Sequence, residues 1–139
     1  MIVLDTNVFS ESLKPSPSEV VLGWLASQEP MAVFLTTITL AEVLYGVETQ
    51  PAGKRRKRLQ VAIESLFASE FQGRILPFDE DAARLFPKIV TTREAMGRPI
   101  SQFDAMIASI CRSRRATVAT RNVDDFEHCG VPIVNPWIE

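Results

Sequence analysis

Short apolar runs alternate with longer amphipathic segments along the whole chain. The runs at 2–4, 32–36, 74–78, 117–119 and 133–134 are rich in β-branched or aromatic residues, which is typical of buried strands. With the helices expected between them, the order of elements is β-α-β-α-α-β-α-α-β-β. This order predicts an α/β fold, a three-layer α/β/α sandwich whose central sheet is mainly parallel and covered by helices on both faces.

The first two long helices are predicted from their start signals and apolar faces. Ser16, followed by Pro17 and then by Glu19, predicts the start of a helix. A second helix is expected over about 39–47. The residues expected on the apolar sides of these two helices are Val20, Val21, Trp24 and Leu25, and then Leu40, Val43, Leu44 and Val47.

The second half of the chain carries further helix signals. A long basic helix is expected to run from the break at 50–53 to about residue 67. Asp79 is a good N-cap for the helix after it, which Pro87 should kink or split. A further helix is expected over 102–113.

Composition places the chain among ordinary soluble proteins. Its 139 residues, 46% hydrophobic and 23% charged, fit a single domain over 1–139. It has no apolar stretch of the roughly 20 residues that span a bilayer and no export signal, so a cytoplasmic location without membrane contact is expected. Cys111 and Cys129 are then expected to be reduced.

The charge of the chain limits how it could bind nucleic acid. A net charge of −2 and a pI near 5.5 exclude a globally basic nucleic-acid binder. A local basic surface is still possible, and two interpretations of one basic run stay open: a solvated helix face, or a positive rim that steers a polyanionic substrate. The run consists of Lys54, Arg55, Arg56, Lys57 and Arg58.

Acidic residues distant in sequence stand at predicted strand ends and helix starts. They are Asp5, Glu42, Asp104 and one of Asp124 and Asp125. Side chains at the carboxyl ends of parallel strands and the starts of the following helices converge on one crevice. Carboxylates gathered there repel one another unless a divalent cation neutralises them. The pattern therefore indicates a hard-metal site, and phosphoryl chemistry is a natural use of such a site.

Each acid also has a purely structural interpretation. Asp5 could cap the helix or turn that follows it. Thr39 with Glu42, and Ser101 with Asp104, both have the spacing of a capping box. Such boxes are common, and a cap at a helix start is compatible with a role in the crevice. The acid in the 124–125 pair could cap a turn.

Common alternative motifs are absent. The sequence contains no G-x-S-x-G elbow, no G-x-x-x-x-G-K-[ST] loop and no G-x-G-x-x-G loop. His128 is the only histidine and is expected in an exposed loop. Serine-hydrolase chemistry and nucleotide-cradling loops are therefore unsupported.

Four segments in sequence order resemble a PIN domain, and two more point to its VapC/FitB-type toxins. The first four are Ile-Val-Leu-Asp-Thr-Asn at 2–7, Thr-Ile-Thr-Leu-Ala-Glu-Val-Leu-Tyr-Gly-Val at 37–47, Asp-Ala-Met-Ile-Ala at 104–108 and Thr-Arg-Asn-Val-Asp-Asp-Phe at 120–126. The other two are Arg-Ile-Leu-Pro-Phe-Asp at 74–79 and Val-Asn-Pro-Trp at 134–137.

This resemblance implies a ribonuclease that depends on Mg²⁺, with Mn²⁺ as a possible substitute. It implies a homodimer held inactive by a cognate antitoxin, which also binds operator DNA. Carried over by position, the metal ligands would be Asp5 and Asp104, with Thr6 supporting Asp5. Glu42 would be the third acid and Asp125 the fourth. Asn122 supports the site, and it stands where some relatives place an acid.

Two other functions remain as alternatives. A haloacid-dehalogenase-like phosphatase also uses an Asp after its first strand, but this chain has Asn7 where that family has a second Asp. A non-catalytic module that binds RNA or protein would use the acids only as helix caps. Dependence of activity on a divalent metal would distinguish a nuclease from such a module.

Overall fold

The five strands form a single parallel sheet. In the computed structural model, which describes residues 1–138, the strand order is β3-β2-β1-β4-β5 and all pairings are parallel. The strands are β1 (Ile2–Leu4), β2 (Val33–Thr36), β3 (Ile75–Leu76), β4 (Thr117–Ala119) and β5 (Ile133–Val134). The predicted parallel sheet is confirmed, although β3 is shorter than expected.

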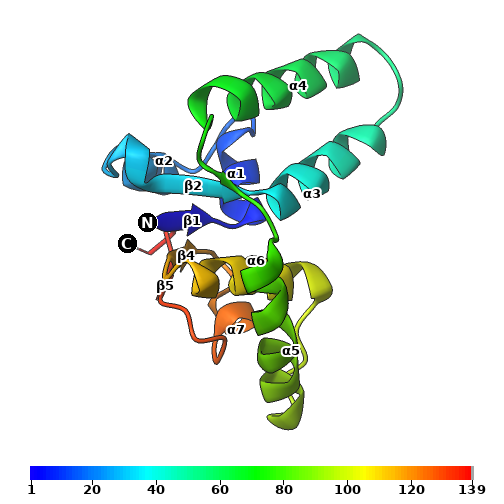
Figure 1. Cartoon of the computed structure of the whole chain (residues 1–139). Helices are drawn as coiled ribbons and strands as arrows, with labels where there is room; N and C mark the ends of the chain where they lie inside the picture. The colour runs from blue at the N-terminus through cyan, green and yellow to red at the C-terminus, as the bar shows by residue number, and fades with distance from the viewer. Residues whose placement is uncertain (139) are drawn as a thin grey trace.

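Helices cover both faces of this sheet, which gives the predicted three layers (Figure 1). One layer holds α1 (Thr6–Ser12), α2 (Glu19–Ala26), α3 (Thr37–Glu48) and α4 (Lys54–Ser65), and α4 continues into a π-helical turn (Leu66–Glu70). The other layer holds α5 (Glu80–Ala95), α6 (Gln102–Ser113) and α7 (Val123–Phe126). A 3-10 turn (Pro30–Ala32) precedes β2.

The alternation of side chains along the central strands creates two cores. In β1, Val3 packs into the cluster that contains residues of α5 to α7, whereas Leu4 packs into the cluster that contains residues of α1 to α4. Val118 and Ala119 divide in the same way in β4. Both faces of the sheet are therefore buried, as expected of parallel strands with continuous apolar runs.

Three helix starts differ from the sequence predictions. Helix α1 was not predicted. The expected start of α2 at Ser16 and Pro17 is wrong, because Ser18 is the N-cap and its hydroxyl accepts from the Val21 amide. Val20, expected on the apolar face, is 54% exposed. The expected Thr39 cap is also wrong, since Thr36 caps α3.

The later helices follow the predictions closely. Asp79 caps α5, whose Ala82 amide donates to the Asp79 carboxylate at 3.0 Å. Pro87 does not split this helix, which runs without interruption past it. Helix α6 has the predicted bounds, with Ser101 as its N-cap. Among residues 1–138, no helix is long and apolar enough to cross a membrane.

Parallel pairing brings the carboxyl ends of the strands to one edge of the sheet. The Asp5 amide donates to the carbonyl of Ala119 at 3.0 Å, and the Thr120 amide donates to the carbonyl of Val134 at 2.9 Å. The segments that leave β1, β4 and β5 are therefore neighbours. Residues from these segments and from the starts of α1, α3, α6 and α7 build the candidate site.

Candidate functional site

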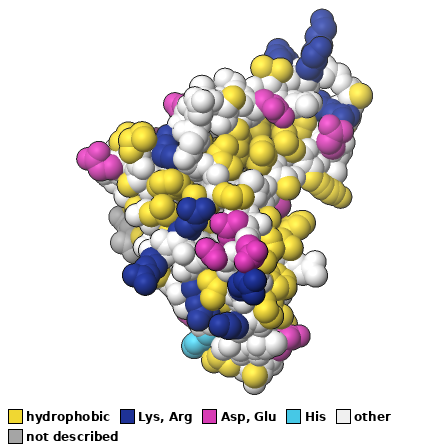
Figure 2. All heavy atoms as spheres, viewed as in Figure 1, with side chains coloured by type: hydrophobic (Ala, Val, Ile, Leu, Met, Phe, Trp, Pro, Cys, Tyr) yellow, Lys and Arg dark blue, Asp and Glu magenta, His cyan; other side chains and the backbone are white. Residues whose placement is uncertain are grey.

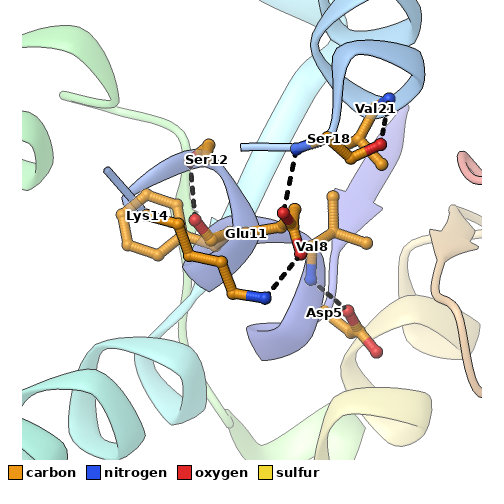
Figure 3. Close-up of polar contacts among 8 residues, drawn as sticks. Asp5, Val8, Glu11, Ser12, Lys14, Ser18 and Val21 are labelled. Atoms are coloured by element: carbon orange, nitrogen blue, oxygen red, sulfur yellow. Dashed lines mark hydrogen bonds and ion pairs between the residues drawn. The ribbon is translucent and has the colours of Figure 1, made fainter. Parts of the chain in front are cut away.

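Asp5 lies at the junction of β1 and α1 and is 4% exposed. Its Oδ1 accepts from the Val8 amide at 2.9 Å, so the predicted N-cap role is confirmed (Figure 3). The pKa of the Asp5 carboxyl is raised to about 6, mainly by burial and in part by repulsion from Asp104, although hydrogen bonds from Thr120 and Val8 act in the opposite direction. Although it caps the helix, the charged form of this carboxylate is therefore unfavourable in the folded protein.

Asp104 lies in the first turn of α6 and is half-buried. Burial raises its pKa, and the negative charges of Asp125 and Glu42 raise it further. The Ser101 hydroxyl and the Arg93 guanidinium oppose this shift. Because Asp5 also interacts with Asp104, the structure brings all three other predicted acids into electrostatic contact with this carboxylate.

The space-filling view agrees with this clustering. Figure 2 shows a group of acidic side chains near the middle of the displayed face, with Lys and Arg side chains beside it. The four predicted acids belong to elements distant in sequence, at the starts of α1 and α6 and within α3 and α7. A shared region of negative charge at this edge is therefore a property of the fold.

Glu42 is held by two threonines. The Thr6 hydroxyl donates to Glu42 Oε1 at 2.6 Å, and the Thr39 and Thr6 hydroxyl oxygens are 3.0 Å apart. Since Thr6 has one hydroxyl proton, Thr39 donates to Thr6. Thr6 was expected to support Asp5, and instead it supports the third acid. Thr39 takes part in the same chain of hydrogen bonds. The sequence suggested a helix cap at Thr39, so this role was not predicted.

Asp125 lies on α7, and a buried arginine donates hydrogen bonds to backbone carbonyls of this segment. Arg93 is 3% exposed, and its Nη1 donates to the carbonyls of Asp124 at 2.9 Å and Glu127 at 2.6 Å. Its Nε donates to the carbonyl of Arg98 at 2.7 Å. Arg93 therefore ties α5 to the segment that carries the fourth acid. Sequence reasoning missed this residue.

Asn122 and Thr120 connect β4 to the site. The Asn122 amide donates to Thr120 Oγ1 at 3.0 Å, and Thr120 in turn hydrogen-bonds to Asp5. The Asn122 side chain is exposed and lies in the same cleft as Asp125. Thr120 is fully buried and was also missed. Its position directly after an apolar strand, as for Asp5, is the signal that could have identified it.

The basic run is not gathered with the carboxylates. Lys54 to Arg58 form the first turns of α4, at the outer end of the α3–α4 hairpin (Figure 1). Arg56 is partly buried and pairs with Glu48, while the other four side chains are exposed. Leu59 and Ile63, further along α4, line the groove that contains Glu42. His128 is exposed as expected, and both cysteines are buried and free.

The carboxylates provide the right type of ligand for a hard cation. All of their donor atoms are oxygen, and their mutual repulsion would fall if a divalent ion bound. Within residues 1–138, no three His, Cys, Asp or Glu side chains are already arranged to hold a metal ion together. Mg²⁺ is commonly held by one or two carboxylates and retains several waters, so the pair Asp5 and Asp104 fits this mode of binding.

Comparison with known proteins agrees with the fold. Residues 2–131 match the family described as PIN domain. The chain is 40% identical over 137 residues to the VapC ribonuclease Y4jK of Sinorhizobium fredii, with 99% of this chain and 98% of the relative covered. It is also 40% identical to the toxin FitB of Neisseria gonorrhoeae, with 99% of each chain covered.

A solved structure shows the same similarity in three dimensions. A chain in the structure of FitAB bound to the IR36 DNA fragment superposes with a TM-score of 0.93 at 40% identity, covering 99% of this chain and 96% of that one. This relationship removes the haloacid-dehalogenase-like alternative. The chain belongs to the PIN-domain family and, within it, to the group that includes the VapC ribonucleases and the FitB toxin.

Proposed function

We propose that this protein is a Mg²⁺-dependent endoribonuclease that acts as the toxin of a toxin–antitoxin pair. The relatives at 40% identity are named a ribonuclease and a toxin. The observation that carries the proposal is that Asp104 lies close to carboxylates from three other elements at this edge of the sheet. Burial and then these neighbouring charges raise the pKa of Asp5 and Asp104. A divalent cation bound there would reduce the repulsion between these carboxylates and would supply the positive charge that phosphodiester hydrolysis needs.

The contacts of each acidic residue suggest its role in the reaction. When bound, Mg²⁺ (or Mn²⁺) lowers the pKa of water and stabilises negative charge on the scissile phosphate. Asp5 and Asp104 would hold the ion, and the cap from Val8 and the bond from Thr120 fix the orientation of Asp5. Asp125 would contribute through water or help to recruit a second ion.

Glu42 is suited to handle a proton of the attacking water. Thr6 occupies its Oε1, which leaves Oε2 to accept a hydrogen bond from that water. The two threonine hydroxyls hold the carboxylate in place, so that little reorganisation is required during the reaction. The basic run at Lys54 to Arg58 is a further proposed contact for distant parts of the RNA.

The proposed partners follow from the family. One is a cognate antitoxin that blocks the carboxylates and binds operator DNA, so that the toxin contacts this DNA only through the antitoxin. The solved FitAB relative is bound to a DNA fragment. We also propose a homodimer and a cytoplasmic location, where RNA substrates are present.

Cleavage of RNA by the purified protein tests this function. Wild type is incubated with a labelled single-stranded RNA pool in Mg²⁺ and, separately, in EDTA. We expect internal cleavage in Mg²⁺, none in EDTA, and none by Asp104→Asn, whose circular dichroism spectrum should match that of wild type. Binding of RNA without cleavage in any metal would instead identify a non-catalytic binding module.

A further inference from the structure

A polar cleft of about 390 Å³ lies beside the carboxylates, where the chain leaves β4 and β5. It is lined by Arg121, Asn122, Val123, Asp124, Asp125 and Asn135. Its volume is within the range of about 300–1,000 Å³ found for small-ligand sites. Because Asp125 belongs both to this cleft and to the acidic site, a molecule in the cleft would be next to the reacting phosphate.

Arg121 gives this cleft a positive group. Its guanidinium lies over the Trp137 ring, 5.0 Å from the ring centroid. Stacking on a flat ring orients a guanidinium while leaving its N–H groups available. In the part of the chain that the structure describes, the Arg121 side chain makes no ion pair. It is therefore available to an external anion.

Asn135 gives the cleft an oriented hydrogen-bond donor. Its Oδ1 accepts from the Trp137 amide at 2.9 Å, which fixes the side chain and leaves the Nδ2 protons for a ligand. Trp137 therefore supports both Arg121 and Asn135. On the other side of the cleft, the segment at Asn122 is joined through Thr120 to Asp5. The cleft is thus built on the same framework as the acidic site.

We propose that this cleft binds the nucleotide next to the scissile phosphate of a single-stranded RNA, an inference that rests on the proposed ribonuclease function. Arg121 binds a phosphate oxygen of that nucleotide, and the Asn135 amide donates to a carbonyl or ring nitrogen of its base. Asp124 and Asp125 repel phosphate from their part of the cleft, so the phosphate lies at the Arg121 end. Base preference at the cleavage site is then set partly by Asn135.

Arg121→Gln tests the phosphate contact, and Arg84→Gln is its matched control. Arg84 is an exposed arginine on α5 that pairs with Glu80, so both variants remove one positive charge from the surface. RNA binding is measured by fluorescence anisotropy in an Asp104→Asn background over a range of salt concentrations. We expect Arg121→Gln to weaken binding about tenfold and to reduce the salt slope by about 0.7, with no change for Arg84→Gln.

Asn135→Ala tests base recognition. A randomised RNA pool is cleaved by the variant in Mg²⁺ and the cut ends are sequenced. We expect the base preference at one position beside the cut to weaken, while the base preferences at the other positions stay as in wild type. Equal effects of Arg121→Gln and Arg84→Gln on binding, or an unchanged base preference in Asn135→Ala, would overturn the assignment.

The two experiments also separate this inference from the proposed function. If wild type binds RNA through Arg121 but does not cleave it in Mg²⁺, the cleft is an RNA site and the nuclease proposal fails. If wild type cleaves RNA and Arg121→Gln binds as Arg84→Gln does, the nuclease proposal stands and the cleft assignment fails. Because Arg121 is exposed, its substitution should not disturb the hydrophobic core, and a change in RNA binding can be assigned to the lost guanidinium.

Discussion

Two buried carboxylates lie at opposite ends of α1 (Figure 3). The pKa of one is raised and that of the other is lowered. Asp5, 4% exposed, precedes the helix, and Glu11, 7% exposed, lies near its end. Glu11 accepts from Lys14 Nζ at 2.9 Å and from the Ser18 amide at 3.0 Å. The Lys14 bond and then the Ser18 bond hold its pKa below the usual range, whereas burial and Asp104 raise that of Asp5 to about 6.

The difference shows that burial alone does not decide what a carboxylate does. Glu11 has a cation and a backbone donor, so it stabilises the folded chain by joining α1 to the start of α2. Asp5 also accepts hydrogen bonds, but burial outweighs them, and the charge of Asp104 adds to the cost of its ionised form. An acid that stays strained in a folded protein is a candidate for function, while a satisfied one is a structural element.

The largest expected effect is on cleavage. Asp5→Asn should lose at least about 100-fold in cleavage rate, because the amide can still cap α1 but is a poor ligand for Mg²⁺. Glu11→Gln should cleave at nearly the wild-type rate at a temperature where it is folded. Initial rates on labelled RNA measure both. Wild-type activity in Asp5→Asn would remove Asp5 from the metal site.

The next effect is on stability at pH 7 without metal. A raised pKa means that the charged form of Asp5 costs free energy in the folded state, at about 1.4 kcal/mol per unit. Asp5→Asn should therefore increase the free energy of unfolding, by up to about 3 kcal/mol. Glu11→Gln should decrease it, since the variant loses the ion pair with Lys14. Urea denaturation compares the variants, and a decrease in both would show that Asp5 is not strained.

A smaller effect is expected on the pH dependence of stability. With its folded pKa near 6, above its ordinary value of 3.8, Asp5 binds a proton more tightly in the folded state. The contribution of Asp5 to stability therefore declines as pH rises through 6. Between pH 5 and 7 this decline should lower the free energy of unfolding by about 1 kcal/mol. Glu11 acts in the opposite sense, because its contribution to stability is present above its ordinary pKa of 4.5 and is lost as pH falls through its lowered folded pKa.

Subtracting the Asp5→Asn curve from the wild-type curve isolates the Asp5 contribution. The free energy of unfolding of Asp5→Asn should exceed that of wild type by more at pH 7 than at pH 5. A difference that stays constant over this interval would contradict the raised pKa. Glu11→Gln serves as the control, since it retains Asp5 and should keep the slope that Asp5 causes.

The fold was predictable where periodicity and caps agree. The apolar run of β1 and the Ser101 cap of α6 define those elements closely. Helix α1 was missed because its polar residues show no clear apolar face. The α3 start was misplaced because Thr36 and Thr39 both precede helical residues, and only the packed structure decides between them.

The site was predictable to the level of residue type. Acids at strand ends and helix starts follow from topology, and the electrostatic contacts of Asp104 agree with that reasoning. The partners of these acids were not predictable. Arg93 bonds to carbonyls 31 and 34 residues away, and Thr6 bonds to an acid 36 residues away. Nothing local in the sequence specifies such contacts.

The most direct test of the central claim is a thermal denaturation series with increasing Mg²⁺. We expect the melting temperatures of wild type and Glu11→Gln to rise with Mg²⁺, because the ion binds the folded carboxylates, and we expect no such rise in Asp5→Asn. An equal rise in wild type and Asp5→Asn, or no rise in wild type, would contradict it.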